Sequence, residues 1–147
     1  RQNLWPNALA KLCGAALNEI PYFDGGLSDA IPVSRALEKG CDRLVVILSK
    51  MRDYVRKPQG MRFLYTMRCR PYPQIISLID HRHIAYNQNL QEVFALERGG
   101  KAFVFAPSHP IHVGTYSMNE QSERDLYALG MEDFNKQKDA LAAFMTE

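Results

Sequence analysis

The chain has 147 residues, of which 46% are apolar and 23% are charged, and its formal net charge is +2. That length corresponds to about one globular domain, which is large enough to bury a core. The composition excludes a disordered, collagen-like or coiled-coil chain, and so small a net charge gives no indication of a nucleic-acid partner.

Three cysteines, Cys13, Cys41 and Cys69, are widely spaced and form no C-x-x-C pair. Such a set predicts free, mostly buried thiols in a reducing compartment. No apolar run approaches the ~18 residues that span a bilayer, and no signal-peptide pattern is present. We therefore expect a cytoplasmic protein and leave peripheral membrane contact open. Because the chain begins at Arg1 rather than Met, we expect a fragment, from which an N-terminal signal could have been lost.

The first part of the chain predicts two short helices around a turn. Residues 7–17, NALAKLCGAAL, are small and helix-favouring and have polar neighbours on both sides. Residues 21–29 predict the end of a strand followed by a turn. Pro32 begins the second helix at a first-turn position that proline tolerates, and Gly40 ends it.

Two apolar runs predict strands of a parallel sheet. Residues 43–49, RLVVILS, are almost continuously apolar, which is typical of a strand buried on both faces between layers of helices. Residues 101–106, KAFVFA, predict a second buried strand. Two strands are too few for a layered sheet, so we expect further strands outside the chain.

The remaining segments predict an exposed connection and further helices. Residues 51–60 are polar and basic, residues 61–68 predict a helix, and residues 74–98 predict a long helix because apolar side chains recur at steps of three and four. Residues 107–119 predict an irregular segment. Residues 120–144 predict an amphipathic helix with an acidic start, and Gly130 favours a break that would divide it in two.

The basic residues are concentrated in residues 50–70. This segment has seven basic residues and one acid, a net +6, whereas the rest of the chain carries −4. A solvated surface is the simpler interpretation, and contact with an anionic surface such as phospholipid headgroups is the alternative. Apolar side chains alternate with the arginines here and could enter a bilayer interface: Met61, Phe63, Leu64, Tyr65 and Met67.

The histidines do not predict a metal site. His81 and His83 are two residues apart on a predicted helix and therefore point to different faces. His109 and His112 could approach one ion, but no Cys, Asp or Glu beside them completes a zinc site. We expect no metal and no organic cofactor.

The Asp24-Gly25-Gly26 motif has two interpretations. A tight turn explains it, in which the glycines adopt positive φ and the aspartate binds the neighbouring backbone. The motif also lies between a predicted strand and a predicted helix, where α/β proteins place their functional sites.

A family resemblance favours the second interpretation. The run Y-x-D-G-G-x-x-D-x-I-P-V at residues 22–33, followed by a helix, Gly40 and D-R-L-V-V-I-L, resembles the C-terminal part of the catalytic domain of patatin-like phospholipases. The R-H-x-x-Y-N stretch at residues 82–87 and K-A-F-V-F-A-P-S at residues 101–108 resemble a bacterial branch of that family. Arg82, Tyr86 and Asn87 have no role that we can assign from it, and structural hydrogen bonding is the simpler expectation.

The resemblance implies a serine lipid acyl hydrolase with a Ser-Asp dyad and a three-layer α/β/α fold. Asp24 matches the family's catalytic aspartate, the general base that accepts the serine proton. Gly25 and Gly26 would allow a tight backbone turn beside it. The implied substrate is a lipid or another carboxylic ester.

The chain lacks the other half of such a site. None of its serines lies in the G-x-S-x-G sequence that carries the family's nucleophile. We therefore expect one partial domain over residues 1–147, with the catalytic aspartate in 1–50, the basic connection and long helices in 51–100 and a strand and helix in 101–147. The serine would come from an upstream N-terminal half, without which the chain is inactive. The alternative is a non-catalytic α/β module that binds an anionic surface or partner through residues 50–70, with Asp24 only a turn residue.

Overall fold

The computed structural model describes residues 16–17, 20–110 and 120–146 and has a mixed α/β fold. The chain divides into two compact units. The first unit contains residues 56–90 and the residues up to 32, and the second contains residues 33–55 and 91–147. Helix α4 (Pro73–Arg98) contributes its first part to the first unit and its last turns to the second.

The first unit begins with a short antiparallel pair, β1 (Ala16–Leu17) and β2 (Ile20–Pro21). The helix predicted for residues 7–17 is wrong at its last two residues, because backbone pairing with β2 overrides their helix propensity there. Residues 7–15 lie outside the described part of the chain. The unit continues with the 3₁₀ helix η1 (Gly25–Leu27), α3 (Arg62–Arg68) and the start of α4.

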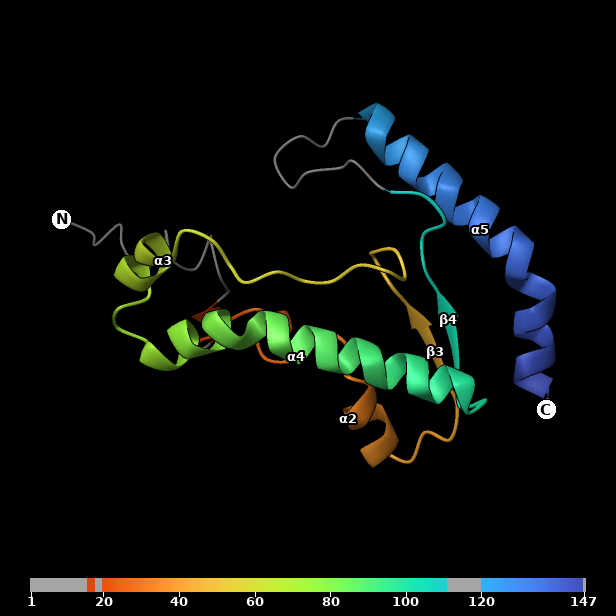
Figure 1. Cartoon of the computed structure of the whole chain (residues 1–147), viewed down its shortest axis with the longest axis horizontal. Coiled ribbons are helices and arrows are strands. Elements are labelled where there is room, and N and C mark those ends of the chain that lie inside the picture. The colour runs from red at the N-terminus through yellow and green to blue at the C-terminus, as the bar shows by residue number, and fades with distance from the viewer. Residues whose placement is uncertain (1–15, 18–19, 111–119, 147) are drawn as a thin grey trace. The chain divides into compact units, whose positions relative to one another are not determined.

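The second unit contains the predicted parallel sheet (Figure 1). Strands β3 (Leu44–Ile47) and β4 (Ala102–Phe105) pair in register from Leu44 opposite Ala102 to Ile47 opposite Phe105. The short helix α2 (Val33–Glu38) precedes β3. Gly40 and Gly100 follow α2 and α4 with φ of 86° and 68°, a conformation that favours glycine, as expected for residues that end helices.

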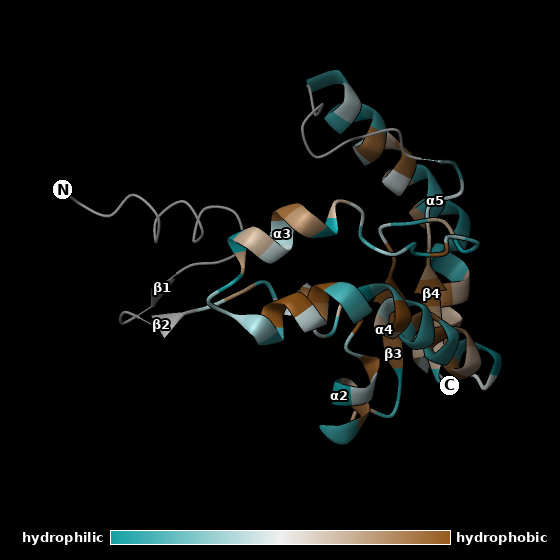
Figure 2. Cartoon of the chain, turned by 60° about the vertical axis from the view of Figure 1, so that its left-hand side comes forward, coloured by the Kyte–Doolittle hydropathy of each residue, from teal (hydrophilic) through white to brown (hydrophobic). Residues whose placement is uncertain are grey.

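Strand β3 is buried on one face only, so the prediction of burial on both faces is wrong. Leu44 and Val46 are buried, whereas Val45 and Ile47 are 44% and 79% exposed. On the other face of the sheet, α5 packs against β4, while the Val45 and Ile47 side chains of the neighbouring β3 remain open to solvent. The buried positions on the sheet, α2 and α4 form an apolar core, brown on β3 and β4 in Figure 2: Val33, Leu44, Val46, Leu48, Val93, Ala102 and Val104.

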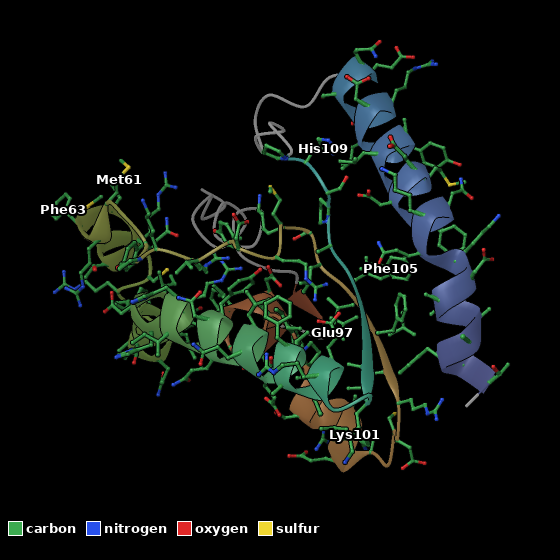
Figure 3. The ribbon with its side chains drawn as sticks, turned by 45° about the vertical axis from the view of Figure 1, so that its right-hand side comes forward. Met61, Phe63, Glu97, Lys101, Phe105 and His109 are labelled. Atoms are coloured by element: carbon green, nitrogen blue, oxygen red, sulfur yellow. The ribbon has the colours of Figure 1, made fainter. Side chains whose placement is uncertain are left out.

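Helix α5 (Glu120–Thr146) packs on β4 through aromatic side chains. The ring centroids of Phe103 and Phe144 are 5.8 Å apart, and those of Phe105 and Phe134 are 6.0 Å apart. Figure 3 shows Phe105 on the side of β4 that faces α5. These contacts anchor the helix at two places along its length.

Helix α5 is continuous, so the break predicted at Gly130 is wrong. A glycine inside a helix costs about 1 kcal/mol relative to alanine. Ion pairs one turn apart lie on both sides of it, between Arg124 and Glu120 and between Lys136 and Glu132. These ion pairs support the helix before and after the glycine, and the aromatic contacts to β4 hold the half that follows it.

The predicted helices over residues 61–68 and 74–98 are confirmed as α3 and α4, and residues 51–60 contain no helix or strand, as expected for a connection. Pro73 occupies the first position of α4, where its missing N–H costs nothing. None of the helices in the described ranges is long and apolar enough to cross a membrane.

Candidate functional site

Asp24 lies at the tip of the loop that follows β2, and its carboxylate is exposed. Its Oδ1 accepts a hydrogen bond from the Gly26 N–H at 2.9 Å, so that Asp24 caps η1. The predicted tight turn is confirmed, because the Leu27 N–H also donates to the Asp24 carbonyl at 3.0 Å. The positive φ expected of Gly25 and Gly26 is wrong, since a 3₁₀ turn keeps φ negative.

The two glycines differ in what surrounds them. A Cβ at Gly26 would lie 3.3 Å from Asp24 Oδ1 and 3.5 Å from Arg82 Nη2, whereas a Cβ at Gly25 would meet nothing within 4 Å. The Gly26 carbonyl accepts a hydrogen bond from Arg82 Nε at 2.8 Å. The Asp24 carboxylate and the Arg82 guanidinium therefore both lie close to the backbone of Gly26, which leaves little room for a side chain there.

Two side chains of α4 hold the loop at its two ends. Arg82 binds the Gly26 carbonyl, and Asn89 Nδ2 donates to Asp29 Oδ1 at 2.7 Å and to the Ile31 carbonyl at 3.3 Å. Arg82 and Asn89 are seven residues apart, which is two turns, so they share a face of the helix. No role was predicted for Asn89 from the sequence. Its spacing of seven residues from Arg82 on a predicted helix does, however, place both side chains on one face.

The last two residues of the R-H-x-x-Y-N stretch, Tyr86 and Asn87, contact Arg56 of the basic connection. Asn87 Oδ1 accepts from the Arg56 N–H at 2.9 Å, and Asn87 Nδ2 donates to the Arg56 carbonyl at 3.1 Å. The Arg56 guanidinium carbon lies 5.5 Å from the centre of the Tyr86 ring. The expectation of structural hydrogen bonding is therefore confirmed for Asn87, while Tyr86 provides a buried ring beneath a cation.

A cluster of three side chains attaches α3 to α4. Arg62 Nε and Nη2 donate to the two oxygens of Asp80 at 3.0 and 2.8 Å, and the Tyr65 hydroxyl donates to Asp80 Oδ1 at 2.6 Å. The hydrogen bonds from Arg62 and then Tyr65 lower the pKa of Asp80 to about 2. The same contacts with Asp80 raise the pKa of Arg62 and of Tyr65.

A second candidate site is a cavity of about 360 Å³ in the second unit, at the carboxyl ends of both parallel strands. It is lined by residues 51–53 after β3, by residues 106–108 after β4 and by Gln137 of α5. This edge of a parallel sheet is where α/β proteins commonly bind ligands. The sequence did not indicate it, because its walls come from three distant segments.

Beside this cavity Asp133 is buried, and its Oδ2 accepts from the Ser108 N–H at 2.9 Å. Burial acts to raise the pKa of Asp133, but hydrogen bonding from Ser108 outweighs it, and the pKa is lowered. Ser108 Oγ lies 2.7 Å from Nδ1 of the adjacent His109. Asp133 therefore fixes the start of the segment after β4, which is a structural use.

In the part of the chain that the structure describes, the candidate metal ligands form no metal centre. No group of three His, Cys, Asp or Glu side chains within the described ranges could hold a metal ion. Of the histidines considered for zinc, His109 is exposed and His112 lies outside those ranges. Cys41 is exposed and Cys69 is buried, both as free thiols, so the expectation of burial holds for Cys69 and is wrong for Cys41. Cys13 lies outside the described residues.

Comparison with known proteins places the chain in a protein family. Residues 72–146 match the family described as "Domain of unknown function (DUF6363)", and the chain belongs to it. The matched part contains α4, β4 and α5, and it includes both Arg82 and Asn89.

A particular relative is the uncharacterized protein YjjU of Escherichia coli (strain K12), which is 32% identical to this chain over 123 residues. The match covers 80% of this chain and 33% of the relative, so the chain spans about a third of that protein's length. No solved structure matches the chain.

Proposed function

We propose that this chain supplies the general base of a lipid acyl hydrolase of the patatin-like kind, and that Asp24 is that base. The observation that carries the proposal is the state of the Asp24 carboxylate. One oxygen is held by the Gly26 N–H, the group is exposed, and Oδ2 accepts no hydrogen bond from any described residue. A carboxylate that is oriented but still has a free oxygen is suited to receive a proton.

In the proposed reaction, Asp24 Oδ2 accepts the proton of a serine hydroxyl as the serine oxygen attacks the ester carbonyl. The proton then passes to the leaving alcohol, and water removes the acyl group in a second round with the same base. Gly26, Arg82 and Asn89 keep the loop in place during both steps. The serine comes from a segment upstream of Arg1, and the dyad itself uses no cofactor.

The proposal includes a larger sheet in the whole hydrolase. The parallel pairing of β3 and β4 and the exposed apolar side chains of Val45 and Ile47 support it, because parallel sheets are normally covered on both faces. In this view further strands and helices of the upstream half complete a three-layer α/β/α domain around the two strands.

The decisive experiment replaces Asp24 by asparagine in the full-length protein. Asparagine keeps an oxygen that accepts from the Gly26 N–H and caps a helical turn as well as aspartate does, so the loop stays folded while the base is lost. We expect kcat for a chromogenic fatty-acyl ester to fall on the order of 10⁴-fold. The matched control is Asp29→Asn, which keeps an acceptor for Asn89 and should retain wild-type activity.

A second measurement locates the nucleophile. A fluorophosphonate should label one serine of the full-length wild-type protein, upstream of Arg1, and the labelling should be strongly slowed in Asp24→Asn. Near wild-type hydrolysis by Asp24→Asn would show that Asp24 is only a turn residue.

A further inference from the structure

Helix α3 carries an apolar face that is open to solvent. Met61, Phe63, Leu64 and Met67 are 73%, 75%, 42% and 58% exposed, and we call these four residues the α3 apolar face. Phe63 and Met67 are one turn apart, so their side chains are neighbours. Figure 2 shows the apolar colour along α3, and Figure 3 shows the labelled side chains of Met61 and Phe63 extending outward from it.

The opposite side of α3 is fixed. Arg62 and Tyr65 bind Asp80 of α4, and Cys69, at the end of α3, is buried. Met61 precedes the helix with φ of 58°, in the left-handed region that an unbranched side chain rarely adopts. A large apolar residue is therefore kept exposed in a backbone conformation that is uncommon for residues other than glycine, and such conformations cluster at functional segments.

The sequence around the α3 apolar face is rich in cations and poor in acids. The sequence has no Asp or Glu between Asp53 and Asp80. Lys57, Arg68 and Arg70 are exposed and have no ionic partner among the residues the structure describes. Arg68 lies one turn after Leu64 on α3, Arg70 follows the helix by two residues, and Lys57 precedes Met61 by four residues, so the three cations lie close to the apolar face along the chain.

We propose that the α3 apolar face and these three cations form a docking surface for an anionic lipid bilayer. Apolar side chains with a basic fringe match the two layers of a bilayer interface, since the side chains enter the boundary with the acyl chains while the cations meet phosphate groups. The uncompensated positive charge selects an anionic surface over a neutral one.

The surface belongs to the same unit as Asp24. Asp80 and Arg82 are two residues apart on α4, and they hold α3 and the Asp24 loop respectively. The docking surface does not rest on the proposed hydrolysis, because no residue of it touches the Asp24 loop in the described contacts. Asp24→Asn should therefore bind vesicles like the wild type, which separates failure of one proposal from failure of the other.

The test is co-sedimentation of the full-length protein with vesicles of phosphatidylcholine alone or of equimolar phosphatidylcholine and phosphatidylglycerol. We expect binding to the anionic vesicles that weakens with salt. The variant Lys57→Gln/Arg68→Gln/Arg70→Gln should lose about 100-fold in partitioning at low salt, at about fivefold per cation. The control variant Lys39→Gln/Arg98→Gln/Lys138→Gln removes three exposed cations of the second unit. Its partitioning onto the same vesicles should stay within about threefold of that of the wild type.

The apolar contribution is tested separately. Phe63→Ser/Met67→Ser should lose at least about tenfold in partitioning, including at high salt. The control Tyr127→Ser/Met145→Ser alters two similarly exposed side chains of α5 and should bind normally. Because all four side chains are exposed, these replacements leave the folded core intact, which circular dichroism verifies.

A direct contact measurement completes the test. The variant Phe63→Trp should show tryptophan fluorescence, beyond that of the wild type, that is quenched by lipids brominated near the headgroup end of the acyl chain. Absence of quenching would overturn the proposal, as would equal losses in the variants and their controls. Soluble heparin provides a further test. If the protein binds heparin as tightly as anionic vesicles, and Phe63→Ser/Met67→Ser does not weaken that binding, the partner is a polyanionic macromolecule and the proposal is overturned.

Discussion

Replacing Arg82 by methionine tests whether the position of Asp24 depends on α4. The change removes the guanidinium whose Nε donates to the Gly26 carbonyl at 2.8 Å and keeps most of the side-chain volume. A hydrogen bond from a charged donor contributes about 1.5–3 kcal/mol, so the free energy of unfolding should fall by about that amount. The loop that carries Asp24 then loses one of its two attachments to the helix.

A shift of the base by about 1 Å costs on the order of 100-fold in rate, so kcat for ester hydrolysis in the full-length protein should fall by roughly 10 to 100-fold. KM should stay nearly constant, because Arg82 acts as a positioning residue. The assays are urea unfolding and steady-state hydrolysis of a chromogenic ester.

The matched control is Arg98→Met, which removes an exposed arginine of the same helix, and Arg82→Lys should restore part of kcat. An Arg82→Met protein that loses stability but keeps the wild-type kcat would show that the contact is structural only and that Arg82 does not position Asp24.

Three further predictions concern single positions. Gly26→Ala should lower kcat about tenfold because its Cβ would crowd the loop carboxylate, whereas Gly25→Ala, in open space, should be nearly neutral in the same hydrolysis assay. The pKa of Asp80 is about 2, below its unfolded value, so the stability that this carboxylate contributes is present above pH 4 and is lost as the pH falls toward 2. Thermal unfolding measured against pH should show this loss of stability, and the loss should be absent in Asp80→Asn. Gly130→Ala should stabilise the protein by about 1 kcal/mol in thermal unfolding, whereas Gly100→Ala, where φ is 68°, should destabilise it.

Local signals in the sequence predicted most element boundaries. Pro73 and Gly100 mark the start and the end of the α4 region, and the recurrence of apolar residues at steps of three and four predicted the helix between them. Such signals act through the backbone of one or two residues and need no distant partner. The break expected at Gly130 is absent because one interior glycine costs only about 1 kcal/mol relative to alanine, and ion pairs one turn apart support the helix on both sides of it.

Burial of the strands was less predictable. An apolar run predicts a strand, but which of its faces is covered depends on where helices from other parts of the chain pack. Helix α5 lies over Phe103 and Phe105 of β4 and leaves Ile47 of β3 exposed. No pattern within β3 itself contains that information.

The sequence by itself determined the Asp24 turn, because the aspartate and the Gly26 N–H are two residues apart and their hydrogen bond is local. Only the tertiary structure decided what holds that turn, since Arg82 is 56 residues from Gly26 and Asn89 is 58 residues from Ile31. It likewise decided that Asp80 holds α3 with its apolar residues outward. A long helix offers polar side chains on every face, and only packing selects which of them meets the loop.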